Sequence, residues 1–276
     1  MKTINVVVLG SKGMLGTDLV NELSMKKYKV FGLDLRDIDI TISDDIKKMS
    51  SLKPEIIINC AAYTNVDGAE NNKALCRKVN VNGVENLADY CKENDILLIH
   101  ISTDYVFNGE KQSYTEDDKK DPINYYGLTK SEGEDAITKQ LRKYYIIRTS
   151  WLFGKNGKNF VKTIIDLCGQ KKEINVVDDQ IGRPTYTKDF SKSIISLFEE
   201  KKPYGTYHIT NSGKCSWFEF ANEIKKQKKL KCKIIPCSSD EYKRDAKRPR
   251  FSVLENNKTD KLRNWKIALK DYLEAE

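Results

Sequence analysis

Apolar residues in the first half of the chain alternate between short continuous runs and longer stretches with helical spacing. Residues 4–9 form an unbroken, β-branched apolar run, which predicts a strand buried on both faces of a parallel sheet. Apolar residues then recur at helical spacing, at Met14, Leu15, Leu19, Val20 and Leu23. The same reasoning predicts strands at 29–33, 55–59, 96–102 and 144–148, and helices at 74–93 and 131–140. Such alternation predicts an α/β fold with a doubly wound parallel Rossmann sheet.

The regular alternation weakens past Trp151. The pattern there predicts a short strand at 174–177, a helix at 188–199, a strand at 207–210, an amphipathic helix at 217–228 and a basic loop at 244–250. We expect a dinucleotide-binding Rossmann domain over residues 1–150 and a smaller C-terminal substrate-binding region over residues 151–276. Parts of that region are expected to return and pack on the Rossmann domain.

Three glycines, Gly10, Gly13 and Gly16, lie between the first strand and the first helix. Their position leaves backbone N–H groups at a helix N-terminus, where the pyrophosphate of a dinucleotide binds. The spacing Gly-x-x-Gly-x-x-Gly departs from the Gly-x-Gly-x-x-Gly of classical dehydrogenases, and an ordinary tight turn is the alternative. The strand and helix on either side favour the cofactor site.

Two residues at the end of the second strand bear on the choice between NADH and NADPH. Asp34 suits the free ribose hydroxyls of NADH, whereas Arg36 suits the 2′-phosphate of NADPH. The two indications conflict, so we expect both cofactors to be used, with a modest preference for NADPH. Asp39 and Ile40 follow and are placed at the adenine edge, although Asp39 is equally suited to cap a helix that starts near Ser43.

Composition restricts the classes of partner. The chain has 48 Lys and Arg against 40 Asp and Glu, a formal net charge of +8, but the two signs interleave without a basic arm. This pattern predicts a mixed-charge surface and no nucleic-acid binding, while the surplus favours an anionic substrate. No apolar run approaches the ~20 residues of a membrane span, and the first strand begins too early for a signal peptide. We expect a cytoplasmic protein without membrane partners.

Cysteine and histidine give no indication of a metal site. The seven cysteines show neither a C-x-x-C pair nor a disulfide framework, which predicts reduced thiols in a cytoplasmic protein. Both histidines, His100 and His208, lie in apolar runs and lack companions with ligand spacing. We therefore expect structural histidines and no metal.

Candidate proton chemistry comes from Thr103, Tyr126 and Lys130. Residues four apart on a helix share a face, so Tyr126 and Lys130 are expected to project into one site. An ammonium near a phenol lowers the phenol pKa, and the phenol can then protonate a developing alkoxide. Thr103, at the end of a predicted strand, is placed to hold the substrate carbonyl oxygen. Tyr-x-x-x-Lys alone is a weak motif, and its place within a Rossmann pattern makes a catalytic role the better interpretation.

These motifs together resemble the extended short-chain dehydrogenase/reductases, and most closely the dTDP-4-dehydrorhamnose reductase family. The stretches that carry the resemblance are NCAAYTNVD (59–67), STDYVF (102–107), YGLTK (126–130), RTSW (148–151), DQIGRPT (179–185) and RP (248–249). They extend from the first quarter of the chain into the last.

The resemblance implies NAD(P)H-dependent reduction of the C4 ketone of dTDP-4-dehydro-L-rhamnose to dTDP-L-rhamnose, a nucleotide sugar used for cell-surface polysaccharide. By the family pattern Thr103, Tyr126 and Lys130 are catalytic, with Tyr126 as proton donor. The implied cofactor-binding residues are Gly10, Gly13, Met14, Leu15, Asp39, Ile40, Ala61 and Ala62. The implied substrate-binding residues are Thr64, Val66, Tyr105, Trp151 and Arg248. From the residues alone, Trp151 is equally well a core aromatic and Arg248 a surface charge.

The chain departs from the family pattern at a magnesium site through which some members dimerise. Asp18 and Lys188 occupy the positions of two glutamates, and a lysine repels the cation. We therefore expect a monomer or weak homodimer.

Two other functions remain open from the sequence. One is a related sugar-nucleotide enzyme: a 4-ketoreductase of different stereochemistry, an epimerase or a dehydratase. A dehydratase usually carries Asp-Glu after the threonine, whereas Asp104 is followed by Tyr105 in this chain. The other is a non-catalytic, cofactor-binding regulatory subunit, against which the intact Tyr126 and Lys130 argue.

Overall fold

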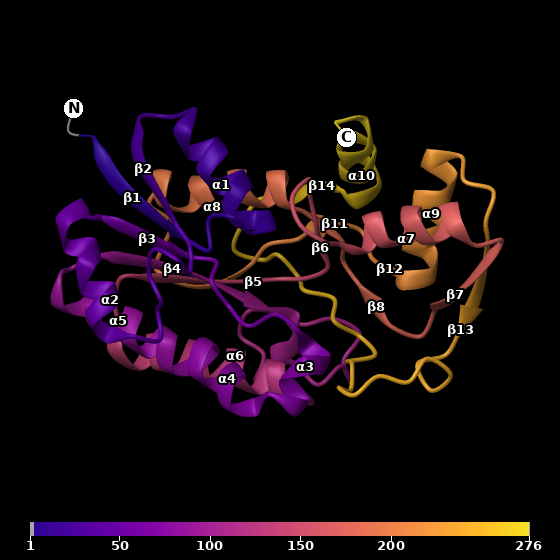
Figure 1. Ribbon diagram of the computed structural model, residues 1–276, viewed down its shortest axis with the longest axis horizontal. Helices are drawn as coiled ribbons and strands as arrows, with labels where there is room; N and C mark the ends of the chain where they lie inside the picture. The colour runs from indigo at the N-terminus through magenta and orange to yellow at the C-terminus, as the bar shows by residue number, and fades with distance from the viewer. Residues whose placement is uncertain (1–2, 276) are drawn as a thin grey trace.

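A six-stranded parallel sheet forms the centre of the molecule, of which the computed structural model describes residues 3–275 (Figure 1). Its strands in chain order are β1 (Ile4–Leu9), β2 (Tyr28–Leu33), β3 (Ile56–Asn59), β4 (Leu97–Thr103), β5 (Tyr144–Thr149) and β10 (Gly205–His208). Across the sheet they lie in the order β10-β5-β4-β3-β1-β2. Because β1 lies between β2 and β3, the chain changes its direction across the sheet at β1. The predicted doubly wound parallel sheet is confirmed, and ligands of such sheets bind at the carboxyl ends of the strands near this switch point.

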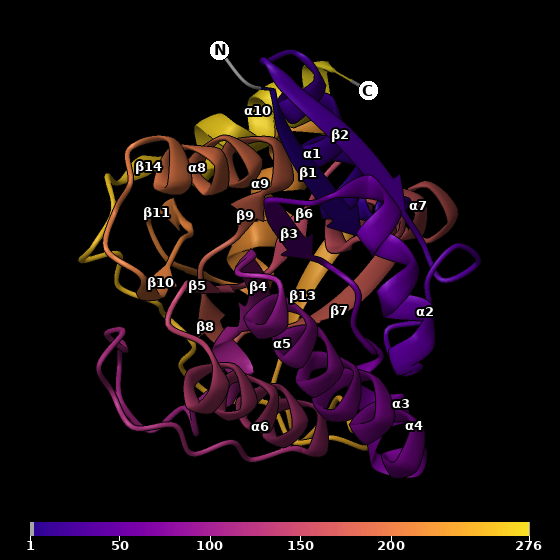
Figure 2. The same cartoon turned by 90° about the vertical axis from the view of Figure 1, so that its left-hand side faces the viewer.

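Helices cover both faces of the sheet (Figures 1 and 2). Successive residues of β1 point to opposite faces, so Val8 packs with Leu19 and Ile194 while Val7 packs with Leu87. The first face is covered by α1 (Met14–Ser24) and α8 (Thr187–Glu199). The second face carries α2 (Ser43–Lys47), α3 (Val66–Asn71), α4 (Lys73–Arg77), α5 (Gly83–Glu93) and α6 (Tyr125–Gln140). The continuous apolar strands predicted from the sequence are therefore buried on both sides.

The remaining elements form a second lobe beyond the carboxyl ends of the strands (Figure 1). Phe153, Phe220 and Tyr272 lie at its apolar centre. Its helices are α7 (Phe160–Gln170), α9 (Trp217–Lys228) and α10 (Trp265–Glu274). Its short strands pair as β6 (Leu152–Phe153) with β9 (Thr185–Tyr186), β8 (Ile181–Gly182) with β12 (Cys215–Ser216), β7 (Glu173–Val177) with β13 (Lys233–Cys237), and β11 (Asn211–Ser212) with β14 (Leu262–Asn264).

Helix α9 has the bounds that the apolar spacing predicts, and local capping explains why. Ser216 accepts a hydrogen bond from the backbone N–H of Glu219, and the Glu219 carboxylate accepts one from the backbone N–H of Ser216. This capping box satisfies two N–H groups that a helix start leaves unpaired.

Three elements differ from the sequence prediction. The helix predicted at 74–93 is interrupted by a π-helical turn at Lys78–Asn82, and the helix predicted at 131–140 begins six residues earlier, at Tyr125. Asn124 sets that start, because its side chain accepts a hydrogen bond from the backbone N–H of Gly127. The strand predicted at 207–210 lies at Gly205–His208 and pairs with β5. The sixth strand of the central sheet thus comes from the second half of the chain, as does α8.

Among the helices of residues 3–275, none is long and apolar enough to cross a membrane.

Candidate active site

The glycine turn lies at the switch point of the sheet, between the end of β1 and the start of α1. Gly10 has φ +70°, and a Cβ atom there would come within 2.9 Å of the Ala61 backbone nitrogen in the turn after β3. A Cβ on Gly16 would meet the Gly10 carbonyl oxygen at 2.1 Å. Only glycine fits these two positions, so the backbone of the turn stays open at the helix N-terminus. Gly13 is the N-cap of α1 and has no side chain that could bond the free N–H groups of the first helical turn. This geometry fits a dinucleotide pyrophosphate.

Met14 and Leu15 open α1 but present different surfaces. Met14 is partly exposed and lies near Gly154 and Gly157 of the second lobe. Leu15 is 6% exposed and packs in the core beneath the sheet. The backbone N–H of Leu15 is therefore the group of this residue that remains available to bind a phosphate.

Asp34 is tied to the glycine turn. Its carboxylate accepts hydrogen bonds from the backbone N–H of Lys12 at 3.0 Å and of Leu35 at 2.8 Å. Arg36, two residues further on, is exposed. The Asp34 carboxylate thus already accepts two hydrogen bonds, whereas the exposed guanidinium of Arg36 is available to bind an added phosphate.

Asp39 and Ile40 lie beside each other with different roles in the fold. The Asp39 carboxylate accepts hydrogen bonds from the backbone N–H of Thr41 at 2.9 Å and from its hydroxyl at 2.8 Å. It makes a local turn and does not cap α2, whose N-cap is Ile42 without a side-chain bond. Ile40 is 4% exposed, and Gly83 of α5 lies directly against it.

The loop after β3 carries Ala61 and Ala62, both partly buried. The backbone N–H of Ala61 donates to Asn59 Oδ1 at 3.0 Å. The amide nitrogen of Asn59 lies 3.1 Å from His100 Nδ1 on β4. This loop therefore faces the glycine turn on one side and a buried histidine on the other.

Thr103 and Tyr126 meet at the carboxyl end of β4. The hydroxyl group of Tyr126 lies close enough to that of Thr103 to interact with it, and Thr103 donates a hydrogen bond to Asp104 Oδ1 at 3.1 Å. The Tyr126 ring packs edge-on against Tyr105, with centroids 6.0 Å apart. Burial raises the pKa of Tyr126, although its interaction with Thr103 lowers it in part. Burial also raises the pKa of Asp104 to about 7. Tyr126 is therefore a neutral phenol at neutral pH, contrary to the lowered pKa expected from the lysine alone.

Lys130 is 2% exposed and lies one helical turn beyond Tyr126. Its amino group donates to the Ile101 carbonyl oxygen at 2.7 Å and lies 3.0 Å from His100 Nε2. Burial lowers the pKa of Lys130 to about 8, because the charged form is poorly solvated there. Burial and the neighbouring lysine hold the pKa of His100 well below its usual value, so the imidazole is neutral.

A buried ion pair between Arg148 and Glu134 fixes the position of α6 on the sheet. Glu134, four residues after Lys130, accepts hydrogen bonds from Arg148 Nε at 2.9 Å and Nη2 at 2.7 Å, and from Ser102 at 2.5 Å. The guanidinium and the hydrogen bonds from Arg148 and Ser102 hold the pKa of Glu134 below its usual value despite burial. Lys130 and Glu134 on α6 thus face His100 and Ser102 on β4, and these contacts hold this face of α6 in position.

The predicted substrate residue Arg248 lies in the basic loop and contacts α3. Its guanidinium bonds both oxygens of Asp67, one of them at 2.8 Å. These bonds hold the pKa of Asp67 at about 2. Arg248 also lies near Tyr105, which packs on Tyr126. Tyr105 therefore connects the basic loop to Tyr126.

Thr64 and Val66 lie immediately before and after Asn65, the N-cap of α3. Thr64 is exposed, and Val66 is the partly buried first residue of the helix. They lie on the chain immediately before Asp67, so the Asp67–Arg248 ion pair brings them next to the basic loop.

The indole of Trp151 contacts Trp217 and Gly182 of the second lobe. Its indole stacks on Trp217, with centroids 3.5 Å apart and planes at 8°. Gly182 lies against its Cε2 and Nε1 atoms, where a Cβ would clash. The backbone of Trp151 is left-handed, with φ 47°. Trp151 is partly exposed, so part of the residue remains accessible to a ligand.

Asp18 and Lys188, the two positions that differ from the magnesium site of the family, lie together where α1 meets α8. Asp18 accepts a hydrogen bond from the Thr187 hydroxyl at 2.5 Å, and burial raises its pKa although Lys188 opposes this. Among residues 3–275 no group of three or more His, Cys, Asp or Glu could hold a metal ion.

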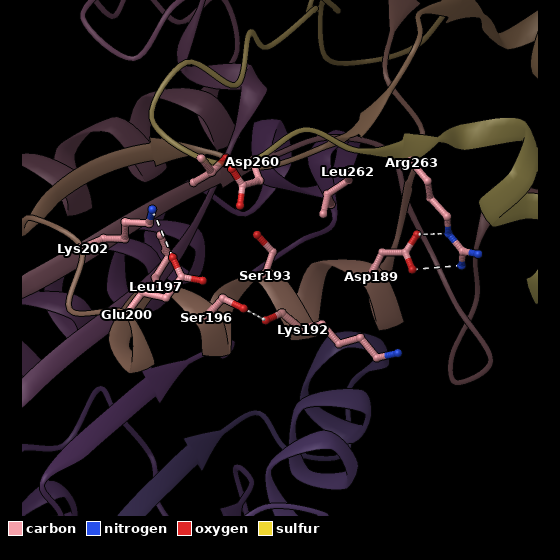
Figure 3. Close-up of a pocket in the computed structure, with 11 residues that line it drawn as sticks. Asp189, Lys192, Ser193, Ser196, Leu197, Glu200, Lys202, Asp260, Leu262 and Arg263 are labelled. Carbon is pink, nitrogen blue, oxygen red and sulfur yellow. Dashed lines mark hydrogen bonds and ion pairs between the residues drawn. The ribbon is translucent and has the colours of Figure 1, made fainter.

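A hollow on the α8 side of the molecule contains none of the predicted site residues (Figure 3). Arg263 and Asp189 form a two-point ion pair at its rim, at 2.8 and 2.9 Å, which fixes β14 to α8. Its other lining residues include Lys192, Ser193 and Asp260, and they mix both charges.

Sequence reasoning missed several residues that hold the site. It treated His100 as structural and gave no role to Asn59, Asn80 or Asp67. Asn80 lies in the π-helical turn, where its amide bonds the backbone of Tyr63 and the Thr129 hydroxyl on α6. None of these roles has a local signal in the sequence, because His100, Asp67 and Asn80 each act through a segment distant along the chain.

Comparisons with known proteins agree with this geometry. The family model described as the RmlD substrate binding domain matches residues 4–276. The spore coat polysaccharide biosynthesis protein SpsK of Bacillus subtilis is 39% identical over 98% of this chain and 96% of its own. The dTDP-4-dehydrorhamnose reductase of Aggregatibacter actinomycetemcomitans is 38% identical over 96% of this chain and 97% of its own.

Solved structures are similar over the whole chain. A dTDP-4-dehydrorhamnose reductase from Bacillus anthracis in complex with NADP has a TM-score of 0.97 at 38% identity and covers 100% of both chains. Another from Clostridium acetobutylicum has a TM-score of 0.96 at 41% identity and covers 99% of both. The family model and these relatives extend over both lobes. The chain therefore belongs to the dTDP-4-dehydrorhamnose reductase family.

Proposed function

We propose that the protein reduces the C4 ketone of dTDP-4-dehydro-L-rhamnose to dTDP-L-rhamnose with NADPH, and with NADH less efficiently. The observation that carries this proposal is the position of Tyr126, whose hydroxyl lies beside Thr103 at the carboxyl end of β4 and one helical turn from the buried Lys130. The glycine turn at the neighbouring switch point has the open backbone that a dinucleotide needs. Relatives that cover 96% and 99% of this chain are named dTDP-4-dehydrorhamnose reductases.

In this proposal the bound nicotinamide supplies a hydride to the C4 carbon of the sugar. Thr103 holds the carbonyl oxygen, and Tyr126 donates its proton to that oxygen as negative charge develops on it. The raised pKa of Tyr126 keeps the phenol protonated until this moment. An alkoxide is a far stronger base than a phenolate, so the transfer remains favourable. Lys130 holds the site and the cofactor ribose from one turn further along α6.

The remaining roles follow the same geometry. Gly10, Gly13, Met14, Leu15 and Gly16 hold the pyrophosphate, while Ala61 and Ala62 face the nicotinamide half of the cofactor. Asp34 and Arg36, with Asp39 and Ile40, receive the adenosine half. Thr64, Val66, Tyr105, Trp151 and Arg248 surround the nucleotide sugar.

The proposal is tested by the absorbance of the nicotinamide during incubation with dTDP-4-dehydro-L-rhamnose. Steady loss of NADPH, stoichiometric with dTDP-L-rhamnose, is expected. A sugar that changes without consumption of cofactor would indicate an epimerase, and silence with NADPH bound would indicate a non-catalytic binding protein. A dTDP-4-dehydro sugar of the opposite configuration serves as the specificity control.

Cofactor preference depends on Arg36. We expect Arg36→Ala to lower kcat/KM for NADPH relative to NADH by roughly fivefold, the ~1 kcal/mol of an exposed ion pair. Kinetics with each cofactor at saturating sugar measure the ratio. Arg142→Ala, another exposed arginine, is the matched control. An unchanged ratio in Arg36→Ala would show that this arginine does not bind the 2′-phosphate.

The stacked pair Trp151–Trp217 separates a substrate role from a packing role. Trp151→Ala and Trp217→Ala each remove this stack, worth about 1 kcal/mol beyond the buried area, and Trp217→Ala also removes the ring contact with Phe160, so both should lower the thermal midpoint. Only Trp151→Ala is expected to lower kcat and sugar affinity together, because its accessible part is proposed to hold the ring. Equal kinetic losses in the two variants would identify Trp151 as a core aromatic.

A further inference from the structure

We propose that Asn59 and His100 form a hydrogen-bonded chain that keeps Lys130 a neutral amine in the enzyme before cofactor binds, which makes His100 a positioning residue of the reductase site. The chain runs from β3 through β4 to α6, and every member of it is buried: Asn59 is 1%, His100 0% and Lys130 2% exposed. Its catalytic consequence rests on the proposed function, while its geometry does not.

The orientation of the Asn59 amide is fixed at one end of the chain. The backbone N–H of Ala61 donates to the side chain of Asn59 at 3.0 Å, so the atom there must be the oxygen. The other end of the amide, 3.1 Å from His100 Nδ1, is therefore the NH2 group. Since this group can only donate, Nδ1 of the imidazole must accept.

The imidazole then has a defined tautomer. A neutral imidazole carries one proton, and with Nδ1 as acceptor the proton is on Nε2. Nε2 lies 3.0 Å from Lys130 Nζ, so its N–H points at the lysine nitrogen. A hydrogen bond forms there only if Lys130 Nζ has a lone pair, which an amine has and an ammonium lacks. The second bond of Lys130, to the Ile101 carbonyl at 2.7 Å, is one that either form can donate.

Protonation of Lys130 leaves one donor facing another wherever the protons are placed. If the ammonium donates to Nε2, the imidazole proton moves to Nδ1 and faces the Asn59 NH2 group. If the Asn59 amide turns over to accept that proton, its NH2 group faces the Ala61 N–H. A buried donor without an acceptor costs about 1–3 kcal/mol, which is equivalent to lowering the lysine pKa by roughly one to two units. The hydrogen-bond pattern therefore disfavours the ammonium independently of its burial.

The other ionisable groups near Lys130 do not reverse this preference. Glu134 raises the lysine pKa, but its charge is already paired with Arg148 and approached by Lys120. The thiols of Cys60 and Cys76 also face the lysine; burial raises the pKa of Cys60 to about 12 and raises that of Cys76, so both are neutral. Burial, partly offset by these neighbours, lowers the pKa of Lys130 to about 8, and the hydrogen-bond pattern lowers it further, so the amine is the main form at neutral pH. The lysine can thus take up and release a proton near neutral pH, which a lysine with an ordinary pKa cannot.

The tautomer of His100 is measured directly by nitrogen NMR of ¹⁵N-histidine-labelled protein without added cofactor. The chain has two histidines, so His100→Gln assigns both sets of signals. We expect a neutral imidazole with its proton on Nε2. A proton on Nδ1, or a doubly protonated ring at neutral pH, would overturn the proposal.

A single substitution should reverse the direction of the hydrogen bonds between residue 59, His100 and Lys130. In Asn59→Asp the carboxylate still accepts from Ala61 but also accepts from Nδ1, so the imidazole proton moves to Nδ1 and Nε2 accepts from a Lys130 ammonium. The pH dependence of kcat/KM for NADPH reports the free enzyme. It should show the ionisation of Lys130, which lies at or below about pH 8 in the unaltered protein, moved upward by at least about one unit. The NMR tautomer should change with it.

Asn94→Asp, which adds the same charge at the far end of α5, is the control and should move neither signal. A thermal melt of each variant shows that it is folded. An unmoved ionisation and an unchanged tautomer in folded Asn59→Asp would overturn the proposal. Failure of the proposed reaction leaves the NMR result informative, and an Nδ1–H tautomer in an active reductase would reject this inference alone.

Discussion

Replacing Tyr126 with phenylalanine should lower turnover by roughly 10²-fold or more while NADPH binding changes little. The substitution removes only the hydroxyl group that lies beside Thr103, and the ring can keep its edge-on packing with Tyr105. Without the hydroxyl, the developing alkoxide has no acid beside it, so the loss appears in the transition state and not in cofactor binding.

Steady-state kinetics and a fluorescence titration with NADPH measure the two quantities in the same preparation. Tyr125→Phe is a matched control, because Tyr125 is the adjacent residue at the start of α6 and contacts Lys73 through its ring. Its turnover should stay near that of the unaltered protein. Turnover of Tyr126→Phe within a few-fold of wild type would remove Tyr126 from the role of proton donor.

Arg248→Ala should reduce kcat/KM for the nucleotide sugar by about 2–3 kcal/mol, which is the range of a charged hydrogen bond and corresponds to roughly 30- to 150-fold. We expect most of this loss in KM, because the guanidinium is proposed to bind the diphosphate. In the structure Arg248 is paired with both oxygens of Asp67. The diphosphate must therefore share or replace that carboxylate.

Arg244→Ala is the matched control for charge, since Arg244 also bonds Asp67 but its side chain is 50% exposed against 13% for Arg248. It should have a much smaller effect, as exposed ion pairs contribute at most about 1 kcal/mol. Equal effects of the two variants would reduce Arg248 to a general surface charge. No effect of either would place the diphosphate elsewhere.

The sequence predicts those parts of the site that depend on neighbours along the chain. The glycine turn follows from a buried strand, three glycines and a helix within one short segment, and Tyr126 and Lys130 share a helix face because they are four residues apart. The family prediction is confirmed by relatives that span the chain.

Contacts between distant segments could not be predicted in this way. The Asn59–His100–Lys130 chain joins three elements, and His100 in an apolar strand is indistinguishable from a structural histidine until α6 is placed over it. The same limit applies to Asp67, whose partner is 181 residues away. Trp151 could be assigned neither to the core nor to the substrate, since its stack on Trp217 depends on the packing of the second lobe.

Local patterns also missed where two elements begin or break. Asn124 starts α6 six residues before its apolar spacing becomes regular, because it caps the helix through Gly127. The π-helical turn at Lys78–Asn82 follows from the bonds of Asn80 to Tyr63 and Thr129. Such turns insert one residue into a helix and recur at functional sites, but the spacing of apolar residues does not record them.

Hydride transfer to C4 is tested most directly with NADPH that carries deuterium at the transferred position. After incubation with dTDP-4-dehydro-L-rhamnose, we expect dTDP-L-rhamnose with one deuterium, bound to C4, and an equal amount of oxidised cofactor. Mass spectrometry and NMR of the isolated product give both the amount and the position of the label. A product without deuterium, a label at another carbon, or a changed sugar with the cofactor still reduced would contradict the proposed reaction.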